Sequence, residues 1–209
     1  MHDEPRPSAP EGPVFHGSNT AVSDDVRVQM TGVSWHAELP GGFVAPTFEQ
    51  LRLLSLRHFT FGGEVAEGRL VVSAVVADEL LEIFQELFML RFPIAKMRLV
   101  DHYGAEDERS MADNNSSAFN CRLIAGTTRP SNHAQGLAVD INPVQNPYIV
   151  RGSVHPAAGT AYADRTHRRP GMFIAGGPEV GAFTRRGWVW GGHWDEPKDY
   201  HHFERPIRR

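Results

Sequence analysis

The chain has 209 residues, of which 41% are hydrophobic, and it carries a formal net charge of −4. This length fits one domain of ordinary size with some excess in termini or loops. The 12 Phe and 4 Trp can supply a sizeable core. The mildly acidic balance argues against a nucleic-acid partner, because no basic patch or stripe is evident.

A single cysteine, Cys121, excludes an intramolecular disulfide framework and a zinc finger built from several thiolates. We expect a buried structural thiol there, since no Cys-His signature surrounds it. No apolar run reaches the roughly 18–20 residues of a membrane span. The polar, acidic N-terminus does not read as a signal peptide. Three origins stay open: a mature fragment of an exported precursor, a protein released by lysis, and a cytoplasmic protein.

The first half of the chain gives mixed signals. Residues 1–30 are rich in Pro, Gly and Ser and predict an extended arm without a core of its own. A helix is expected to begin after Pro46, with Thr47 as its cap and Gln50 at the capping-box position. Four leucines follow over residues 51–56. The chain then turns at residues 62–63, and β-branched residues predict a short strand over 69–73.

The clearest helix covers residues 77–92. Leu80, Phe84 and Leu87 recur at three- and four-residue steps, as on the apolar face of an amphipathic helix. Pro93 then ends it. A strand is predicted over residues 97–101, and another is expected to begin in residues 119–122.

The second half predicts short elements separated by loops. A small strand is expected over residues 137–142, a long irregular loop over 145–178, and a short helix over 178–186 that ends at Gly187. Strands are expected over 188–190 and 200–204. No internal repeat or linker divides the chain. The sequence predicts one α+β domain over residues 31–209, with a small antiparallel sheet and helices on one face.

Two distant segments together hold the ingredients of a metal site. His133 and Asp140 are seven residues apart, and a turn at Gly136 between them would let both face one ion. The run from Asp199 to Glu204 is the only dense supply of a third ligand. Two histidines and one carboxylate suit zinc, with a water at the fourth position. Iron bound by a facial triad is the chemical alternative.

The choice within this last segment follows from strand geometry. His201 and His202 are neighbours, so on a strand they point to opposite faces and only one should bind. Asp199 precedes His202 by three residues and would stand at the mouth of the site as general base. His193 is the rival ligand, although its Gly-Gly-His-Trp setting is typical of a turn. The other histidines are expected on the surface or in loops: His2, His16, His36, His58, His102, His155 and His167.

These residues resemble the VanY-type D-alanyl-D-alanine carboxypeptidases and their zinc-peptidase relatives. That group includes D-Ala-D-Ala dipeptidases, phage L-alanyl-D-glutamate endopeptidases and the hedgehog signalling domain. The resemblance covers about residues 98–204 and depends on Ser-x-His-x6-Asp followed by Asp-x-x-His. Further similar stretches lie at residues 119–122, 141–148, 186–192 and 198–204. The first hundred residues carry no matching motif.

The resemblance implies a hedgehog-like or D-Ala-D-Ala-peptidase-like fold and one bound zinc ion. It also implies roles for individual residues. Asp199 stands where many relatives have Glu, which shortens the catalytic acid/base by one methylene. The implied zinc ligands are His133, Asp140 and His202, with Asp199 as acid/base, Arg122 stabilising the oxyanion, and Ser131 holding the terminal carboxylate or backbone of the substrate.

The implied function is zinc-dependent hydrolysis of peptidoglycan stem peptides, with D-Ala-D-Ala carboxypeptidase action first. One alternative is an endopeptidase that cuts at L-Ala-D-Glu or at a cross-link. Another is a binding module that kept the zinc fold without catalysis, which Asp199 and Arg122 argue against because such a module needs neither. The family leads us to expect an extracytoplasmic location, and we expect a monomer.

Overall fold

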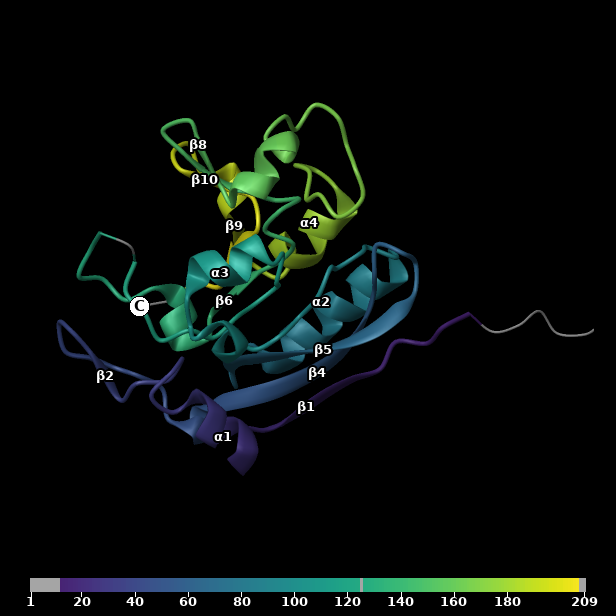
Figure 1. The fold of residues 1–209 in the computed structure, drawn as a ribbon. Helices are drawn as coiled ribbons and strands as arrows, with labels where there is room; N and C mark the ends of the chain where they lie inside the picture. Colours follow the sequence, from purple (N-terminus) through teal and green to yellow (C-terminus); the bar gives the residue numbers. More distant parts are fainter. Residues whose placement is uncertain (1–11, 125, 207–209) are drawn as a thin grey trace, which may run out of the picture.

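The structure is a computed structural model that describes residues 12–124 and 126–206. The part of the predicted arm in residues 1–11 therefore lies outside the described residues. Helices and strands, most of them short, follow one another in mixed order along the chain (Figure 1). The strands are β1 (Gly17–Ala21), β2 (Glu38–Leu39), β3 (Phe43–Val44), β4 (Leu51–Phe59), β5 (Val65–Ser73), β6 (Ala138–Asp140), β7 (Tyr148–Val150), β8 (Ser153–His155), β9 (Val189–Trp190), β10 (Lys198–Asp199) and β11 (His202–Glu204).

The helices are equally short apart from one. The α-helices are α1 (Asp24–Met30), α2 (Ala77–Met89), α3 (Asp107–Ala112) and α4 (Pro178–Thr184). The 3-10 helices are η1 (Phe48–Gln50), η2 (Val100–Tyr103), η3 (Asn132–Gln135), η4 (Ala157–Tyr162) and η5 (Gly191–His193).

The longest strands form an antiparallel sheet in the order β1-β4-β5. Its central strand is buried on both faces. Leu54 pairs with Leu70 on the face covered by α2, whereas Leu53 pairs with Val71 on the opposite face. Figure 1 shows α2 lying along this sheet. The helix begins at Ala77 as predicted and ends at Met89, three residues earlier than predicted.

The segment after Pro46 corrects the prediction of a helix. The capping box of Thr47 and Gln50 does form, but it closes only the 3-10 turn η1. The leucines that follow belong to β4. A run of leucines that is buried on both faces has no strict alternation, so its pattern could not separate a strand from a buried helix.

The region predicted as an extended arm contributes to the core. Residues 17–21 form β1, which pairs with β4, and α1 follows directly. Val22, Val26 and Met30 are buried with Leu53 and Val71 on the face of the sheet opposite α2. Helices therefore lie on both faces of this sheet, not on one. The domain boundaries at residues 30 and 31 stay a prediction.

The second half builds two further three-stranded antiparallel sheets, in the orders β6-β11-β9 and β10-β7-β8. The strand expected over 137–142 is β6, the one expected over 188–190 is β9, and the one expected over 200–204 is β11. The helix expected over 178–186 is α4. The loop expected over 145–178 is more ordered than predicted, since it contains the hairpin of β7 and β8 and the turn η4.

Two expected strands do not form. Over residues 97–101 only Met97 makes an isolated bridge, and η2 begins at Val100. Residues 119–121 are buried and Arg122 is partly buried, but all four belong to no strand. The fold class is α+β as predicted, with several small sheets in place of one. No helix within residues 12–124 and 126–206 is long and apolar enough to cross a membrane.

Candidate metal centre

The first histidine of the site is held by a tight turn. Ser131 is the N-cap of η3, and its hydroxyl accepts a hydrogen bond from the backbone N–H of His133 at 3.3 Å. Gly136 ends the turn in the left-handed conformation with φ of 68°, which glycine adopts without steric cost. The chain then enters β6, so His133 and Asp140 approach from a turn and from the following strand, as predicted.

Asp140 is fixed between two neighbouring segments. Its backbone exchanges two hydrogen bonds with Ser117, of 2.9 and 2.8 Å. On the other side β6 pairs with β11, and Asp140 lies directly opposite His202. Side chains of directly opposed residues point to the same face of an antiparallel pair, so this register places the carboxylate and the imidazole side by side.

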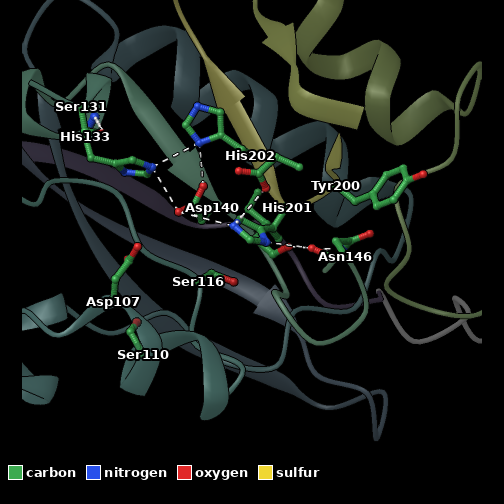
Figure 2. A network of polar contacts seen from close by, with 12 residues as sticks. Asp107, Ser110, Ser116, Ser131, His133, Asp140, Asn146, Tyr200, His201 and His202 are labelled. Carbon is green, nitrogen blue, oxygen red and sulfur yellow. Dashed lines mark hydrogen bonds and ion pairs between the residues drawn. The ribbon is translucent and has the colours of Figure 1, made fainter. Parts of the chain in front are cut away.

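Three side chains then converge on one point, as Figure 2 shows. The Nε2 atom of His133 is 3.1 Å from Asp140 Oδ2 and 3.2 Å from His202 Nδ1. His202 Nδ1 is 2.9 Å from Asp140 Oδ1. All three residues are buried, and their ligand atoms lie within 4.8 Å of one another. The structure thus brings together the three residues that the resemblance implies as ligands.

Outer contacts determine which ring nitrogens face this point. His133 Nδ1 lies 2.5 Å from the carbonyl oxygen of Ala118, and His202 Nε2 lies 3.1 Å from Glu204 Oε2. Both oxygens can only accept, so each outer nitrogen carries the proton. In the neutral rings the inner nitrogens, Nε2 of His133 and Nδ1 of His202, then offer lone pairs. Asp140 adds a third electron-rich atom.

This donor set fits a small divalent cation. Ligands at about 2.0–2.1 Å around a tetrahedral zinc ion stand about 3.3 Å apart, close to the observed distances of 2.9–3.2 Å.

The pKa shifts at this site also fit a bound cation. Burial would raise the pKa of Asp140, but the charges and hydrogen bonds of the surrounding histidines hold it well below 3.8. Burial lowers the pKa of His202, yet the hydrogen bonds with Asp140 and Glu204 outweigh it and raise that pKa to about 10. The ionised carboxylate of Asp140 therefore stabilises positive charge at this point, as a bound cation requires.

Asp199 lies beside this group, where sequence reasoning expected it. Its Oδ1 is 3.1 Å from His201 Nε2, which is itself 4.0 Å from Asp140 Oδ2. Burial raises the pKa of Asp199. The negative charge of Asp140 adds to this shift, whereas the charges of His201 and His202 oppose it. A buried carboxyl with a raised pKa is suited to accept and return a proton.

His201 is a site residue that sequence reasoning set aside. It is buried, and its Nδ1 lies 2.8 Å from the carbonyl oxygen of Asn146. His201 precedes the first residue of β11, so strict alternation of neighbouring side chains does not apply to it. Its ring consequently reaches Asp199 and the edge of the metal group.

The partly buried side chain of Arg165 contacts segments next to this site. The Arg165 guanidinium donates to the side-chain oxygen of Asn146 at 3.1 Å and to the carbonyl oxygen of Phe173 at 2.6 Å, and it stacks on the ring of Tyr200. Burial lowers the pKa of Arg165 to about 10. These contacts tie Asn146, which precedes the hairpin, to Tyr200, which directly precedes His201 and His202 in the chain.

Arg122 and Ser131 each make a contact with another part of the protein. Arg122 donates through Nη2 to Asp107 Oδ2 at 2.7 Å, and its side chain is 28% exposed. Part of the guanidinium therefore stays free for another acceptor. Ser131 is a buried N-cap, so its hydroxyl oxygen already has a structural use. The catalytic and substrate-binding roles of these two residues stay predictions.

Among the residues that the structure describes, the other histidines lie outside the metal group, and His2 lies outside the described residues. His193, the rival ligand, lies in η5 with its ring against the edge of Trp190 and outside the metal group. His58 corrects a prediction, because it is only 4% exposed, on β4, and not on the surface. Cys121 is buried as expected, and burial raises the pKa of its thiol.

Comparison with known proteins supports a peptidase. Residues 125–205 match the family model described as D-alanyl-D-alanine carboxypeptidase. No curated protein and no solved structure matches the chain. The matched segment contains all three residues of the metal group and Asp199, whereas Arg122 precedes it. Over residues 125–205, about two fifths of its length, the chain is thus similar to the D-alanyl-D-alanine carboxypeptidase family of peptidases.

Proposed function

We propose that this protein is a zinc-dependent peptidase that hydrolyses peptidoglycan stem peptides and cuts their terminal D-Ala-D-Ala bond. The observation that carries the proposal is the convergence of His133 Nε2, Asp140 and His202 Nδ1 inside the family-matched segment. Each histidine is held by an outer acceptor, so that in the neutral ring the inner nitrogen offers its lone pair. Two histidines and one carboxylate leave one coordination position open for water or substrate, as in catalytic zinc sites.

The side chains around this centre supply the proton chemistry. When bound, zinc acts as a Lewis acid that polarises a carbonyl and makes water more acidic. Asp199 takes the proton of the attacking water and returns it to the amine that leaves. Its burial suits this exchange because a raised pKa brings the carboxyl closer to the pH at which it works. His201, in contact with Asp199 Oδ1, holds the carboxylate in place.

Arg122 is the group that stabilises the negative charge formed during the reaction. Its Nη2 is engaged by Asp107, which restricts the guanidinium while other N–H groups can still donate to the oxyanion of the tetrahedral intermediate. The Ser131 hydroxyl oxygen accepts a hydrogen bond from the His133 N–H, and its own O–H can still donate. We assign that hydroxyl to the backbone or terminal carboxylate of the substrate.

The choice between carboxypeptidase and endopeptidase depends on the rim of the site. The hairpin of β7 and β8 reaches the site through β10, in which Asp199 lies opposite Tyr148. Burial raises the pKa of Tyr148, and the negative charge of Asp199 raises it further. An aromatic rim at this place can contact the substrate beside the scissile bond, so it is the segment that we expect to determine which peptide bond is cut.

The test is digestion of chemically defined stem peptides by the zinc-loaded protein, with mass spectrometry of the products. Loss of one terminal D-Ala supports the carboxypeptidase, whereas cleavage within the stem moves the assignment to the endopeptidase. Asp199→Ala should bind zinc but cut at least about a hundredfold more slowly. Asp195→Ala is the matched control, since Asp195 is exposed and lies four residues away. Zinc binding without any cleavage would overturn the peptidase and leave the binding module.

A further inference from the structure

Glu204 occupies a specific position behind the metal group. Its Oε2 lies 3.1 Å from His202 Nε2, the ring nitrogen that points away from Asp140. The same oxygen accepts a hydrogen bond of 2.7 Å from Asn132 Nδ2. Asn132 belongs to η3, directly before His133. Glu204 therefore links the two chain segments that carry the histidines without facing the ion itself.

Strand geometry explains this contact. His202 and Glu204 are two residues apart on β11, so their side chains leave the same face of the strand. Phe203 between them points to the other face and is fully buried in the main core. Burial of that ring anchors the strand, and the carboxylate and imidazole on the opposite face are thereby held next to each other.

The two histidines of the centre are oriented by different kinds of acceptor. His133 uses the backbone carbonyl of Ala118, which no substitution of a side chain removes. His202 uses the Glu204 carboxylate, which is a stronger acceptor because it is charged. An imidazole that donates one N–H to a carboxylate has a fixed tautomer and a more basic second nitrogen.

We propose that Glu204, held by Asn132, is a positioning residue that fixes the tautomer and ring orientation of His202 and so presents its Nδ1 to the metal ion. This inference rests on the proposed zinc site and adds a residue outside its ligand set. Glu204 does not touch the substrate in this assignment. Its effect reaches the reaction only through the affinity and geometry of the metal.

The primary experiment measures the zinc affinity of the full chain by competition with a chromogenic chelator. Glu204→Ala should bind zinc about 10–100-fold more weakly than the unmodified chain, the usual range for loss of an outer-shell partner. Glu204→Gln should also weaken binding, since its amide is a neutral acceptor and can present N–H groups to the ring instead. Asn132→Ala should cause a smaller loss in the same direction.

A matched control and a direct readout separate positioning from general structure. Glu196→Gln changes a carboxylate that accepts a hydrogen bond from the backbone of Arg151 and forms no hydrogen bond or ion pair with any described histidine, so its zinc affinity should be unchanged. In 15N-histidine spectra of the zinc-free chain at a pH where His202 is neutral, and of the zinc-loaded chain, His202 should carry its proton on Nε2. Glu204→Ala should mix the tautomers of the zinc-free chain.

The outcomes distinguish the two claims. If the unmodified chain fails to bind zinc, the proposed function fails and this inference with it. If the unmodified chain binds zinc and folded Glu204→Ala and Glu204→Gln bind it within twofold of that affinity, only the role of Glu204 is refuted. If both variants lose thermal stability but keep zinc affinity and the His202 tautomer, Glu204 is a structural residue and the inference is likewise overturned.

Discussion

The backbone N–H of Ser73 donates a hydrogen bond of 2.9 Å to the carbonyl oxygen of Gly136, so the end of β5 touches the turn between two candidate metal ligands. A Cβ atom at Gly136 would lie 2.5 Å from Ser73 N, and φ there is +68°. This contact makes the turn a part of the core sheet, and it makes the glycine testable.

Gly136→Ala should destabilise the protein more than Gly104→Ala does. Both glycines have nearly the same φ, but a Cβ at Gly104 would meet no atom within 4 Å. The left-handed conformation should cost about 1–2 kcal/mol in each variant, and the clash at Gly136 should add about 1–3 kcal/mol. Urea denaturation measures both free energies of unfolding. Equal losses would mean that the backbone of β5 moves away without cost.

Zinc should raise the thermal stability of the protein through the metal group. At a free zinc concentration of a hundred times Kd, binding adds about 2.7 kcal/mol to the free energy of unfolding. Asp140→Asn removes the charge that the two histidines share and should abolish most of this gain. His193→Asn leaves all three residues of the metal group in place, so this variant should keep the stabilisation by zinc. Differential scanning calorimetry with and without chelator provides the comparison.

Phe203→Ala should rank among the most destabilising single changes. The ring is fully buried, and it stacks on Phe183 with centroids 3.9 Å apart. Removing a buried aromatic ring costs about 3–5 kcal/mol. Val75→Ala, at a residue 81% exposed, should stay within about 0.5 kcal/mol. A loss below about 1 kcal/mol for Phe203→Ala, measured by urea denaturation, would contradict the packing described for β11.

His58 should make the protein less stable in mild acid. Burial lowers the pKa of His58 below 6.5, while its backbone hydrogen bonds oppose this shift. The unfolded chain then binds the proton more readily, so stability is complete above about pH 6.5 and declines as the pH falls below that value toward the pKa in the folded protein.

Comparison of the unmodified chain with His58→Gln isolates this contribution. Both are unfolded by urea between pH 5 and pH 8 in the presence of chelator. The difference between their free energies of unfolding should change by at most about 1.4 kcal/mol per pH unit below pH 6.5 and should be constant above it. A difference that does not vary with pH would show that His58 keeps its ordinary pKa.

The sequence predicts best those elements whose pattern has one physical reading. The steps between Leu80, Phe84 and Leu87 fit only a helix with one buried face, and α2 is that helix. The leucines of β4 are buried on both faces, so their pattern fitted a helix as well as a strand. An isolated bridge at Met97 and the 3-10 helix η2 replaced the strand expected at residues 97–101. Residues 119–122 form no regular element. Both predictions failed because partners distant in sequence decide strand pairing.

The missed hairpin shows the limit of turn signals. Arg151 and Gly152 join β7 to β8, and both have positive φ, as a type I′ turn requires. The sequence Asn-Gly or Asp-Gly would have predicted such a turn. Arg-Gly does not, and the two flanking strands have only three residues each.

At the site, spacing and residue type identified which side chains to consider but not their contacts. His133, Asp140 and His202 were named from motif spacing, and the structure brings them together. The contact of Glu204 with His202 could have been read from their two-residue separation on a strand. The contact of His201 with Asp199 could not, because it depends on where β11 begins.

The register of β6 against β11 also bears on how the protein folds. Asp140 and His202 face each other although 62 residues separate them in the chain. Pairing of segments so distant is slow, since the loop between them must close before the contacts form. We therefore expect the capacity to bind metal to arise late in refolding, once this pairing is made. The ion then acts on the finished fold, so it should slow unfolding while leaving the folding rate nearly unchanged.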